Sequence, residues 1–336
     1  MGKSWGIAMI AVAVLLVGCG GGGDSGKKAL EPLFPPRELH LGLDGYASPA
    51  TAGILLAEKR GYFESRGLEM WTTSPGSPLS PIPYVVDEAV DIGISHLPEV
   101  ALAREEGTPI VAIGSLIDEP TASVIWPRKS KIRGIADLKG KTIAMTGLPF
   151  QEDFFARVLA RGGLSLADVT IQRAGYDVVP ALVSGRADAI FGGSLNIEGR
   201  ELEARGVEPV VTEVRDLGVP AYDELVLIVR RDRLAKEPRL YRNFLSAVAH
   251  GTAEALEDPK AAANAIRESV NGNGEVSRET TEAGVKATVP LLSRDGFMDP
   301  ARAEELTEWM RKEGMTRQSL PASDLLTNDY LEPPRP

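Results

Sequence analysis

The sequence contains almost no cysteine or histidine. Its 336 residues include one cysteine, Cys19, and three histidines, His40, His96 and His250, which are widely separated. One thiol cannot form an internal disulfide framework, and a structural zinc site needs several cysteine or histidine ligands at close spacing. We therefore expect neither a disulfide scaffold nor a metal, and the sequence indicates no cofactor.

Positive charge is also scarce. Lys and Arg number 37 against 47 Asp and Glu, a net charge of −10. Nucleic-acid binding needs a basic face, so we expect no nucleic-acid partner. The hydrophobic fraction of 43% and the charged fraction of 25% are typical of a soluble globular protein. The length favours two domains.

Sequence motifs of common enzymes are missing. There is no Gly-x-Ser-x-Gly, His-Glu-x-x-His or Gly-x-Gly-x-x-Gly. The segment 134–142 looks like a phosphate-binding loop, but its spacing is one residue too long and it precedes a strand instead of following one. We predict that the protein is not an enzyme, and keep an enzyme as the alternative.

Long hydrophobic runs are limited to the N-terminus. Ile7 to Val17 is uninterrupted and apolar, and as a helix it spans roughly 16 Å, about half of a bilayer core. It ends in Leu16-Val17-Gly18-Cys19, which resembles the lipobox of bacterial lipoproteins. This predicts a signal peptide over 1–18 and lipidation of Cys19, followed by a glycine-rich and proline-rich tether over 19–37. In the alternative, the signal peptide is ordinary and Cys19 is incidental.

The remaining chain repeats one β-α-β-α-β order, which predicts an α/β fold with parallel sheets flanked by helices. The first unit has strands at 40–43, 69–73 and 90–94 and helices at 50–60 and 84–89. The second unit has strands at 142–145, 169–171 and 187–191 and helices at 152–161 and 178–184. The C-terminal third reads as helical, with a packed face on 240–256 and a helix over 301–313 that Asp299 caps.

Strand-like crossings at 122–126 and 224–229 join the two units. We therefore predict two lobes: lobe one from 38–127 and 221–336, and lobe two from 128–220. In open parallel sheets, ligands bind beyond the carboxyl ends of strands. A cleft between the lobes is the expected site.

Several segments resemble the solute-binding proteins of ABC importers, in the group that includes binders of thiamine pyrimidine precursors, nitrate and alkylsulfonates. The resemblance rests on 91–104, 135–141, 177–185, 218–226 and 326–331. It implies a two-lobed type II periplasmic-binding fold with two hinge strands that closes around one small molecule. The implied partners are an ABC permease and its ATPase, and the protein is expected to be a monomer at the cell membrane, lipid-anchored and facing the extracytoplasmic space.

Asn196-Ile197-Glu198-Gly199 and the segment 218–222 look most like the pyrimidine-precursor branch. The Glu198 carboxylate suits the amine and protonated ring nitrogen of an aminopyrimidine; alternatively, it is a solvated residue at a helix start. The predicted ligand-binding residues are Asp44, Tyr46, Ser95, His96, Thr146, Ser194, Asn196, Glu198 and Tyr222.

Aromatic residues typical of that branch are missing, since the chain has Asp44-Gly45-Tyr46 where the branch has Asp-Trp. Either Tyr46, His96, Phe150 and Tyr176 supply the stacking, or the solute differs, with an alkylsulfonate, nitrate or a flavin as alternatives. The resemblance extends to a yeast pyrimidine synthase, but the cysteine-rich motif of that enzyme is absent here. A third possibility is a surface interaction protein that uses the fold as a scaffold.

Overall fold

The computed structural model describes residues 30–74, 80–269 and 278–332. The described residues from Glu31 onward belong to one compact unit. The predicted signal peptide, Cys19 and the tether up to residue 29 lie outside the described residues, so lipidation stays a prediction. Within the described ranges, no helix is both long enough and apolar enough to cross a membrane.

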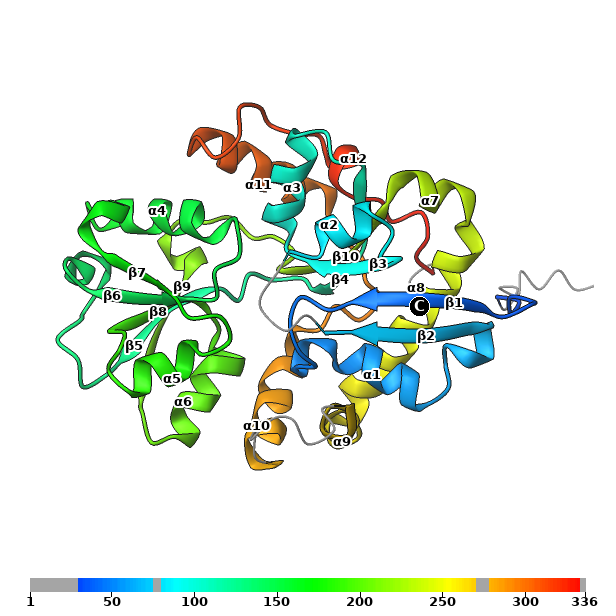
Figure 1. Ribbon diagram of the computed structural model, residues 1–336, viewed down its shortest axis with the longest axis horizontal. Helices are drawn as coiled ribbons and strands as arrows, with labels where there is room; N and C mark the ends of the chain where they lie inside the picture. The colour runs from blue at the N-terminus through cyan, green and yellow to red at the C-terminus, as the bar shows by residue number, and fades with distance from the viewer. Residues whose placement is uncertain (1–29, 75–79, 270–277, 333–336) are drawn as a thin grey trace, which may run out of the picture. The chain divides into compact units, whose positions relative to one another are not determined.

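The described strands form two five-stranded sheets, with orders β2-β1-β3-β10-β4 and β7-β6-β8-β5-β9 (Figure 1). The first sheet contains β1 (Arg37–Gly42), β2 (Leu68–Thr73), β3 (Ile92–Ser95), β4 (Ile110–Ile117) and β10 (Leu225–Arg230). The second contains β5 (Ser123–Pro127), β6 (Thr142–Met145), β7 (Thr170–Arg173), β8 (Ala189–Gly193) and β9 (Pro209–Glu213). The repeated order predicted from the sequence therefore corresponds to two similar sheets.

One strand in each sheet runs against its neighbours. β10 is antiparallel to β3 and β4, and β5 is antiparallel to β8 and β9, whereas β1–β2, β1–β3, β6–β7 and β6–β8 are parallel. Both antiparallel strands follow a crossing from the other half of the chain. The sheets are therefore mainly parallel, as predicted.

The crossing strand β5 corrects one predicted boundary. We assigned residues up to 127 to lobe one, but β5 pairs with β8 and β9 of the second sheet. The chain has thus already crossed at Thr121 and Ala122, before the strand begins. The rest of the lobe division stays a prediction.

Helices cover both faces of the first sheet. α1 packs against α8 and α9 on one side, and α2, α3, α11 and α12 contact its strands or one another on the other. These helices, with α7 and α10, are α1 (Ala52–Lys59), α2 (Ile82–Val86), α3 (Leu97–Glu105), α7 (Arg231–Lys236), α8 (Pro238–Glu257), α9 (Pro259–Ser269), α10 (Arg278–Thr288), α11 (Pro300–Lys312) and α12 (Ala322–Leu325).

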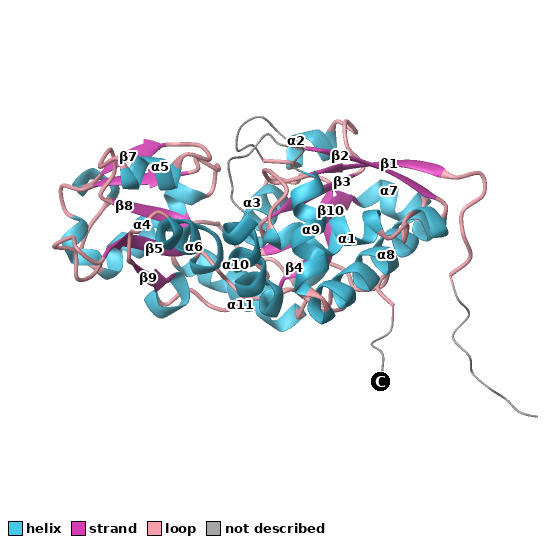
Figure 2. Cartoon of the chain, turned by 90° about the horizontal axis from the view of Figure 1, so that it is seen from below, coloured by secondary structure: helices cyan, strands magenta, loops and turns pink. Residues whose placement is uncertain are grey.

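The second sheet lies between α4 (Gln151–Arg161) on one face and α5 (Val178–Val183) with α6 (Arg200–Ala204) on the other. Alternation along β6 explains this, because Ile143 and Met145 join the buried cluster that contains α4, while Ala144 joins the cluster that contains α5. α10 also contacts α6, and Figure 2 shows these two helices side by side. The C-terminal segment thus reaches the helices that flank the second sheet.

The helical expectations for the C-terminal third are confirmed. Leu240, Phe244, Val248 and Thr252 are buried on α8. The Asp299 side chain accepts the backbone N–H of Ala301 over 2.9 Å and caps α11. The α-helix expected at 84–89 instead begins at residue 82 and ends at residue 86, before Glu88, which has a φ of 58° that no α-helix accommodates.

Candidate functional site

Most of the predicted site residues lie where strands end. Asp44 and Tyr46 follow β1, His96 follows β3, and Thr146 follows β6. Ser194, Asn196 and Glu198 follow β8, the last two within the single π-helical turn η5 (Leu195–Gly199). This edge of an α/β sheet is where ligands bind, because loops and helix starts leave their polar groups unpaired there.

Side-chain contacts join this edge of the first sheet to that of the second. The rings of Tyr46 and Tyr176 meet edge to face with centroids 5.3 Å apart. The His96 imidazole lies 5.1 Å from the Phe150 ring. The strand ends of the two sheets therefore face one another, as the predicted site requires.

These contacts pair the four aromatic residues named from the sequence as substitutes for the missing rings. Tyr46 and Tyr176 come from the loops after β1 and β7, and His96 and Phe150 from those after β3 and β6. Tyr46 is 45% exposed, so its ring is not part of the core. Phe150 is 7% exposed and belongs to a buried cluster.

His96 is held by Glu224. Its Nδ1 lies 3.0 Å from Glu224 Oε1, and the two side chains are 16% and 7% exposed. Burial raises the pKa of Glu224, but the hydrogen bond and charge of His96, with two backbone N–H donors, outweigh burial and lower it. Burial lowers the pKa of His96, but Glu224, Asp44 and Glu99 outweigh burial and raise it. Each partner therefore favours the charged form of the other.

Glu198 has one carboxylate oxygen engaged and one available. Oε2 accepts the Ser194 backbone N–H over 2.7 Å and the Ser194 hydroxyl over 3.1 Å. No other residue within the described ranges donates to Oε1. Burial raises the pKa of Glu198, and the Ser194 donors offset this in part. A carboxylate in this state gains from a cationic partner.

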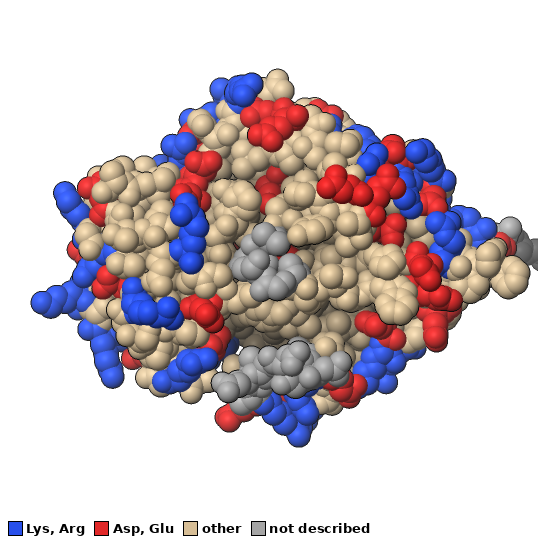
Figure 3. All heavy atoms as spheres, viewed as in Figure 1, with Lys and Arg blue, Asp and Glu red and all other residues tan. Residues whose placement is uncertain are grey.

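Asp44 is a second desolvated carboxyl group. Burial raises its pKa, and the charge of His96 lowers it in part. Both carboxylates act on the Tyr46 hydroxyl. Burial raises the pKa of Tyr46 most, and the charges of Glu198, Glu201 and Asp44 raise it further. One carboxylate from each sheet thus acts electrostatically on the same hydroxyl. Elsewhere, on the face shown in Figure 3, acidic and basic side chains are interspersed.

Asn196 and Thr146 form contacts within the protein. Asn196 donates to the Thr288 hydroxyl over 2.7 Å in a buried position. Thr146 donates to Gln151 Oε1, which also accepts the backbone N–H groups of Gly147 and Leu148. Sequence reasoning missed Gln151, which fixes the loop after β6 from the first turn of α4.

Ser95 and Tyr222 are the most deeply buried of the predicted residues. The Ser95 hydroxyl donates to Glu99 over 2.7 Å, and Ser95 is 0% exposed. Tyr222 is 1% exposed, with its hydroxyl 3.4 Å from Glu224 Oε2. Both side chains are therefore packed inside the protein in this structure. The ligand role of all nine residues stays a prediction.

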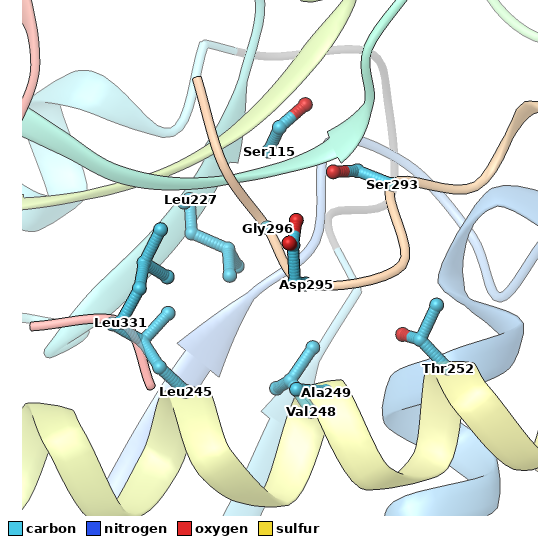
Figure 4. A pocket seen from close by; sticks show the side chains of 11 residues that line it. Ser115, Leu227, Leu245, Val248, Ala249, Thr252, Ser293, Asp295, Gly296 and Leu331 are labelled. Atoms are coloured by element: carbon cyan, nitrogen blue, oxygen red, sulfur yellow. The ribbon is translucent and has the colours of Figure 1, made fainter. Parts of the chain in front are cut away.

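The described part of the chain shows no cluster of metal-type ligands and has a small cavity beside the first sheet. There, no group of three or more His, Cys, Asp and Glu is arranged to hold a metal ion. A cavity of about 10 Å³ lies between β4, α8 and the loop at 293–296, lined by Ser115, Ser293, Asp295 and apolar side chains (Figure 4). Its size suits about one water molecule, too little for a solute.

Comparison with known proteins gives one family match and several relatives. The model of the NMT1/THI5-like family matches residues 48–262. A Haemophilus influenzae protein named for thiamine biosynthesis is 30% identical over 290 residues, which cover 86% of this chain and 91% of that protein. The formylaminopyrimidine-binding protein of Halalkalibacterium halodurans is 26% identical over 332 residues and covers 97% and 99%.

Solved structures confirm the fold. The alkanesulfonate-binding protein of Xanthomonas axonopodis, bound to MOPS, has a TM-score of 0.67 at 17% identity and covers 88% of this chain and all of that one (100%). A Candida albicans protein described as having the generic periplasmic binding protein fold also has a TM-score of 0.67, at 14% identity, with coverage of 89% and 99%. The predicted periplasmic-binding fold is therefore confirmed.

Other relatives contradict one prediction. The 4-amino-5-hydroxymethyl-2-methylpyrimidine phosphate synthase of Schizosaccharomyces pombe is 26% identical over 298 residues, covering 85% of this chain and 83% of the enzyme. Synthases of the same name from Saccharomyces cerevisiae and Aspergillus parasiticus cover 65% of the chain. The prediction that the protein is not an enzyme was therefore wrong. It relied on the absence of common catalytic motifs, and that absence does not exclude an enzyme.

Proposed function

Because the chain belongs to the NMT1/THI5-like family and has the periplasmic-binding fold, we propose that it binds a small amine-bearing heteroaromatic solute, of the aminopyrimidine type found in thiamine precursors. The solute occupies the region where the strand ends of the two sheets face one another. The binding proteins among the relatives support this choice of class, since one is named for a formylaminopyrimidine.

The observation that carries the proposal is a pair of desolvated carboxyl groups, one from each sheet. Asp44 follows β1 and Glu198 follows β8, and both act on Tyr46. Glu198 Oε1 is available to accept from a ligand. An amine and a protonated ring nitrogen donate to such groups, whereas a sulfonate or nitrate is repelled by them. Tyr46 and Tyr176 supply flat apolar surface for the ring.

We place this binding step in import. The solute is captured outside the cytoplasm, the lobes close on it by rotation about the crossings, and the loaded monomer docks on an ABC permease driven by its ATPase. Cys19 anchors the protein through lipid after removal of residues 1–18. Mass spectrometry of the N-terminal peptide tests the anchor: the acyl mass on Cys19 is expected, and an unmodified thiol, or membrane association unchanged in Cys19→Ala, contradicts it.

The binding test uses purified full-length protein and isothermal titration calorimetry. The solutes are 4-amino-5-hydroxymethyl-2-methylpyrimidine, its aminomethyl and formylaminomethyl relatives, riboflavin, taurine and nitrate. Saturable binding of a pyrimidine alone is the expected result. Binding of taurine or nitrate without any pyrimidine supports the alkylsulfonate or nitrate alternative, and binding of riboflavin alone supports the flavin alternative. Either result overturns the proposal.

The fungal relatives favour a second candidate, an enzyme of pyrimidine synthesis, because proteins bearing the synthase name match most of the chain. Mass spectrometry of each mixture after long incubation separates the candidates. A pyrimidine phosphate that accumulates in proportion to protein concentration favours the synthase. Recovery of the added solute at its original mass favours the binding protein.

A further inference from the structure

One carboxylate, that of Glu224, connects both chain crossings to the candidate site. Its Oε2 accepts the backbone N–H groups of Thr121, over 2.7 Å, and Ala122, over 3.1 Å, immediately before β5. Its Oε1 lies 3.0 Å from His96 Nδ1. Glu224 itself immediately precedes β10. The outgoing crossing, the return crossing and the loop after β3 therefore meet at one side chain that is 7% exposed.

The chemistry of this contact fixes the position of a proton. An ionised carboxylate only accepts hydrogen bonds, so Nδ1 of His96 must carry the hydrogen. No residue in the described ranges contacts Nε2 through a hydrogen bond. The imidazole is 16% exposed and lies beside the Phe150 ring.

The other titratable groups around His96 favour the imidazolium form. Asp44 lies after β1, Glu99 is on α3, and Glu224 precedes β10; each raises the pKa of His96. Phe150, which precedes α4 and packs against His96, is apolar and adds no charge. These carboxyl groups favour a hydrogen on Nε2 as well, and Nε2 has no hydrogen-bond partner within the described part of the protein.

We propose that Glu224 is a positioning residue that fixes the protonation and orientation of His96, so that His96 Nε2–H donates a hydrogen bond to the bound solute. This rests on the proposed function and refines its solute class. The preferred solute carries a hydrogen-bond acceptor, such as a ring nitrogen or a hydroxyl or carbonyl oxygen. This is in addition to the amine that donates hydrogen bonds to the carboxylates. Because Glu224 also holds Thr121 and Ala122, loss of its charge acts on the site and the crossings together.

The first test measures the protonation of His96 without any solute. Full-length protein with labelled histidine is titrated by NMR, and His96→Gln identifies the His96 signal among those of the three histidines. We expect Glu224→Gln, which can still accept from Thr121 and Ala122, to lower the pKa of His96 by about one unit or more. An unchanged His96 pKa overturns the proposal.

Asp223→Asn is the matched control. It removes the neighbouring buried carboxyl group from the same crossing, but Asp223 is influenced by Ser115, Asp118 and Arg302 and does not act on His96. The His96 titration is expected to be the same as in wild type. If Glu224→Gln does not fold, the wild-type protein still decides, because a His96 pKa below the ordinary histidine range overturns the proposal.

The second test measures binding of 4-amino-5-hydroxymethyl-2-methylpyrimidine between about pH 5 and 9. In wild type, affinity is expected to fall about tenfold or more as pH rises through the His96 pKa, which is the usual weight of a charge-assisted hydrogen bond. In Glu224→Gln this fall occurs at lower pH, and in Asp223→Asn it does not move. An identical pH profile in wild type and Glu224→Gln overturns the role of His96 as donor. Absence of pyrimidine binding in wild type refutes the proposed function instead, and leaves the NMR result on Glu224 to stand separately.

Discussion

Asn196 donates its side-chain N–H to the hydroxyl oxygen of Thr288 over 2.7 Å, and both residues are buried. The bond joins η5, next to the second sheet, to the last residue of α10. The sequence assigned Asn196 to the solute because the segment 196–199 resembles the pyrimidine-precursor branch. In the structure its amide already has a partner within the protein, which gives it a measurable role in stability.

Thr288→Val is expected to lower the free energy of unfolding by about 1–3 kcal/mol, because it leaves the buried Asn196 amide without an acceptor. Urea denaturation measures this. The matched double variant Asn196→Leu with Thr288→Val removes both polar groups and is expected to recover part of the loss. Strictly additive effects of the two substitutions would contradict a direct contact.

Local patterns explain why much of the fold could be predicted. Alternating or continuous apolar runs gave most strands to within two residues, and Asp299 with Pro300 located the start of α11. β4 was missed although all eight of its residues are buried. Its continuous apolar run, Ile110–Ile117, was the available signal. β9 begins with Pro209 and has no fully buried residue, so its sequence carries little strand character.

The candidate site was only partly predictable, for a physical reason. Residues that follow strand ends could be named, because every parallel sheet places such loops at one edge. The partners of those residues could not. Glu224 lies 128 positions from His96, and Thr288 lies 92 from Asn196. Contacts of this range depend on how the two sheets meet, which periodicity within one segment does not encode.

Packing of α1 on α8 depends on two glycines. A Cβ on Gly251 would lie 2.7 Å from Ala57 Cβ and would collide with the Gly53 carbonyl oxygen. We expect Gly251→Ala to lower the free energy of unfolding by about 3 kcal/mol, because backbone cannot move aside as a flexible side chain does. Thermal unfolding measures this. Gly134→Ala is the control, since no atom lies within 4 Å of its added Cβ, and a similar loss there would contradict the argument.

Glu198→Gln is expected to weaken binding of 4-amino-5-hydroxymethyl-2-methylpyrimidine by about 1.5–3 kcal/mol, because the amide loses the charge that receives the ligand's donors. Calorimetry measures the change. Glu203→Gln serves as the control, since Glu203 lies on α6 and forms a surface ion pair with Arg200. Equal affinities for wild type and Glu198→Gln would support the alternative of a solvated glutamate.

The His96–Glu224 pair predicts a window of pH in the stability of the protein. The pKa of His96 is raised on folding, so its contribution is complete below the unfolded value of about 6.5 and disappears as pH rises through the folded value. The pKa of Glu224 is lowered, so its contribution is complete above about 4.3 and disappears as pH falls through the folded value. The coupling energy from a cycle of His96→Gln and Glu224→Gln should therefore be largest between these values. A coupling energy that is constant across the range would rule out an ion pair.

Tyr176→Phe separates stability from binding at the same edge. The Tyr176 hydroxyl is buried and has no hydrogen-bond partner among the described residues. It lies close to Gly45, between Asp44 and Tyr46 in the chain, since a Cβ added at Gly45 would be 3.2 Å from it. Removal of an unsatisfied hydroxyl is expected to leave the free energy of unfolding unchanged or to raise it by up to about 1 kcal/mol. A solute that completes this hydroxyl's hydrogen bonding would bind the variant about fivefold to tenfold more weakly. Tyr46→Phe provides the comparison, because the Tyr46 residue is 45% exposed and its hydroxyl is not among the buried unsatisfied groups, so its loss should leave stability unchanged. If Tyr176→Phe instead lowers stability and leaves solute affinity intact, the hydroxyl serves the fold and the solute lies elsewhere along the edge.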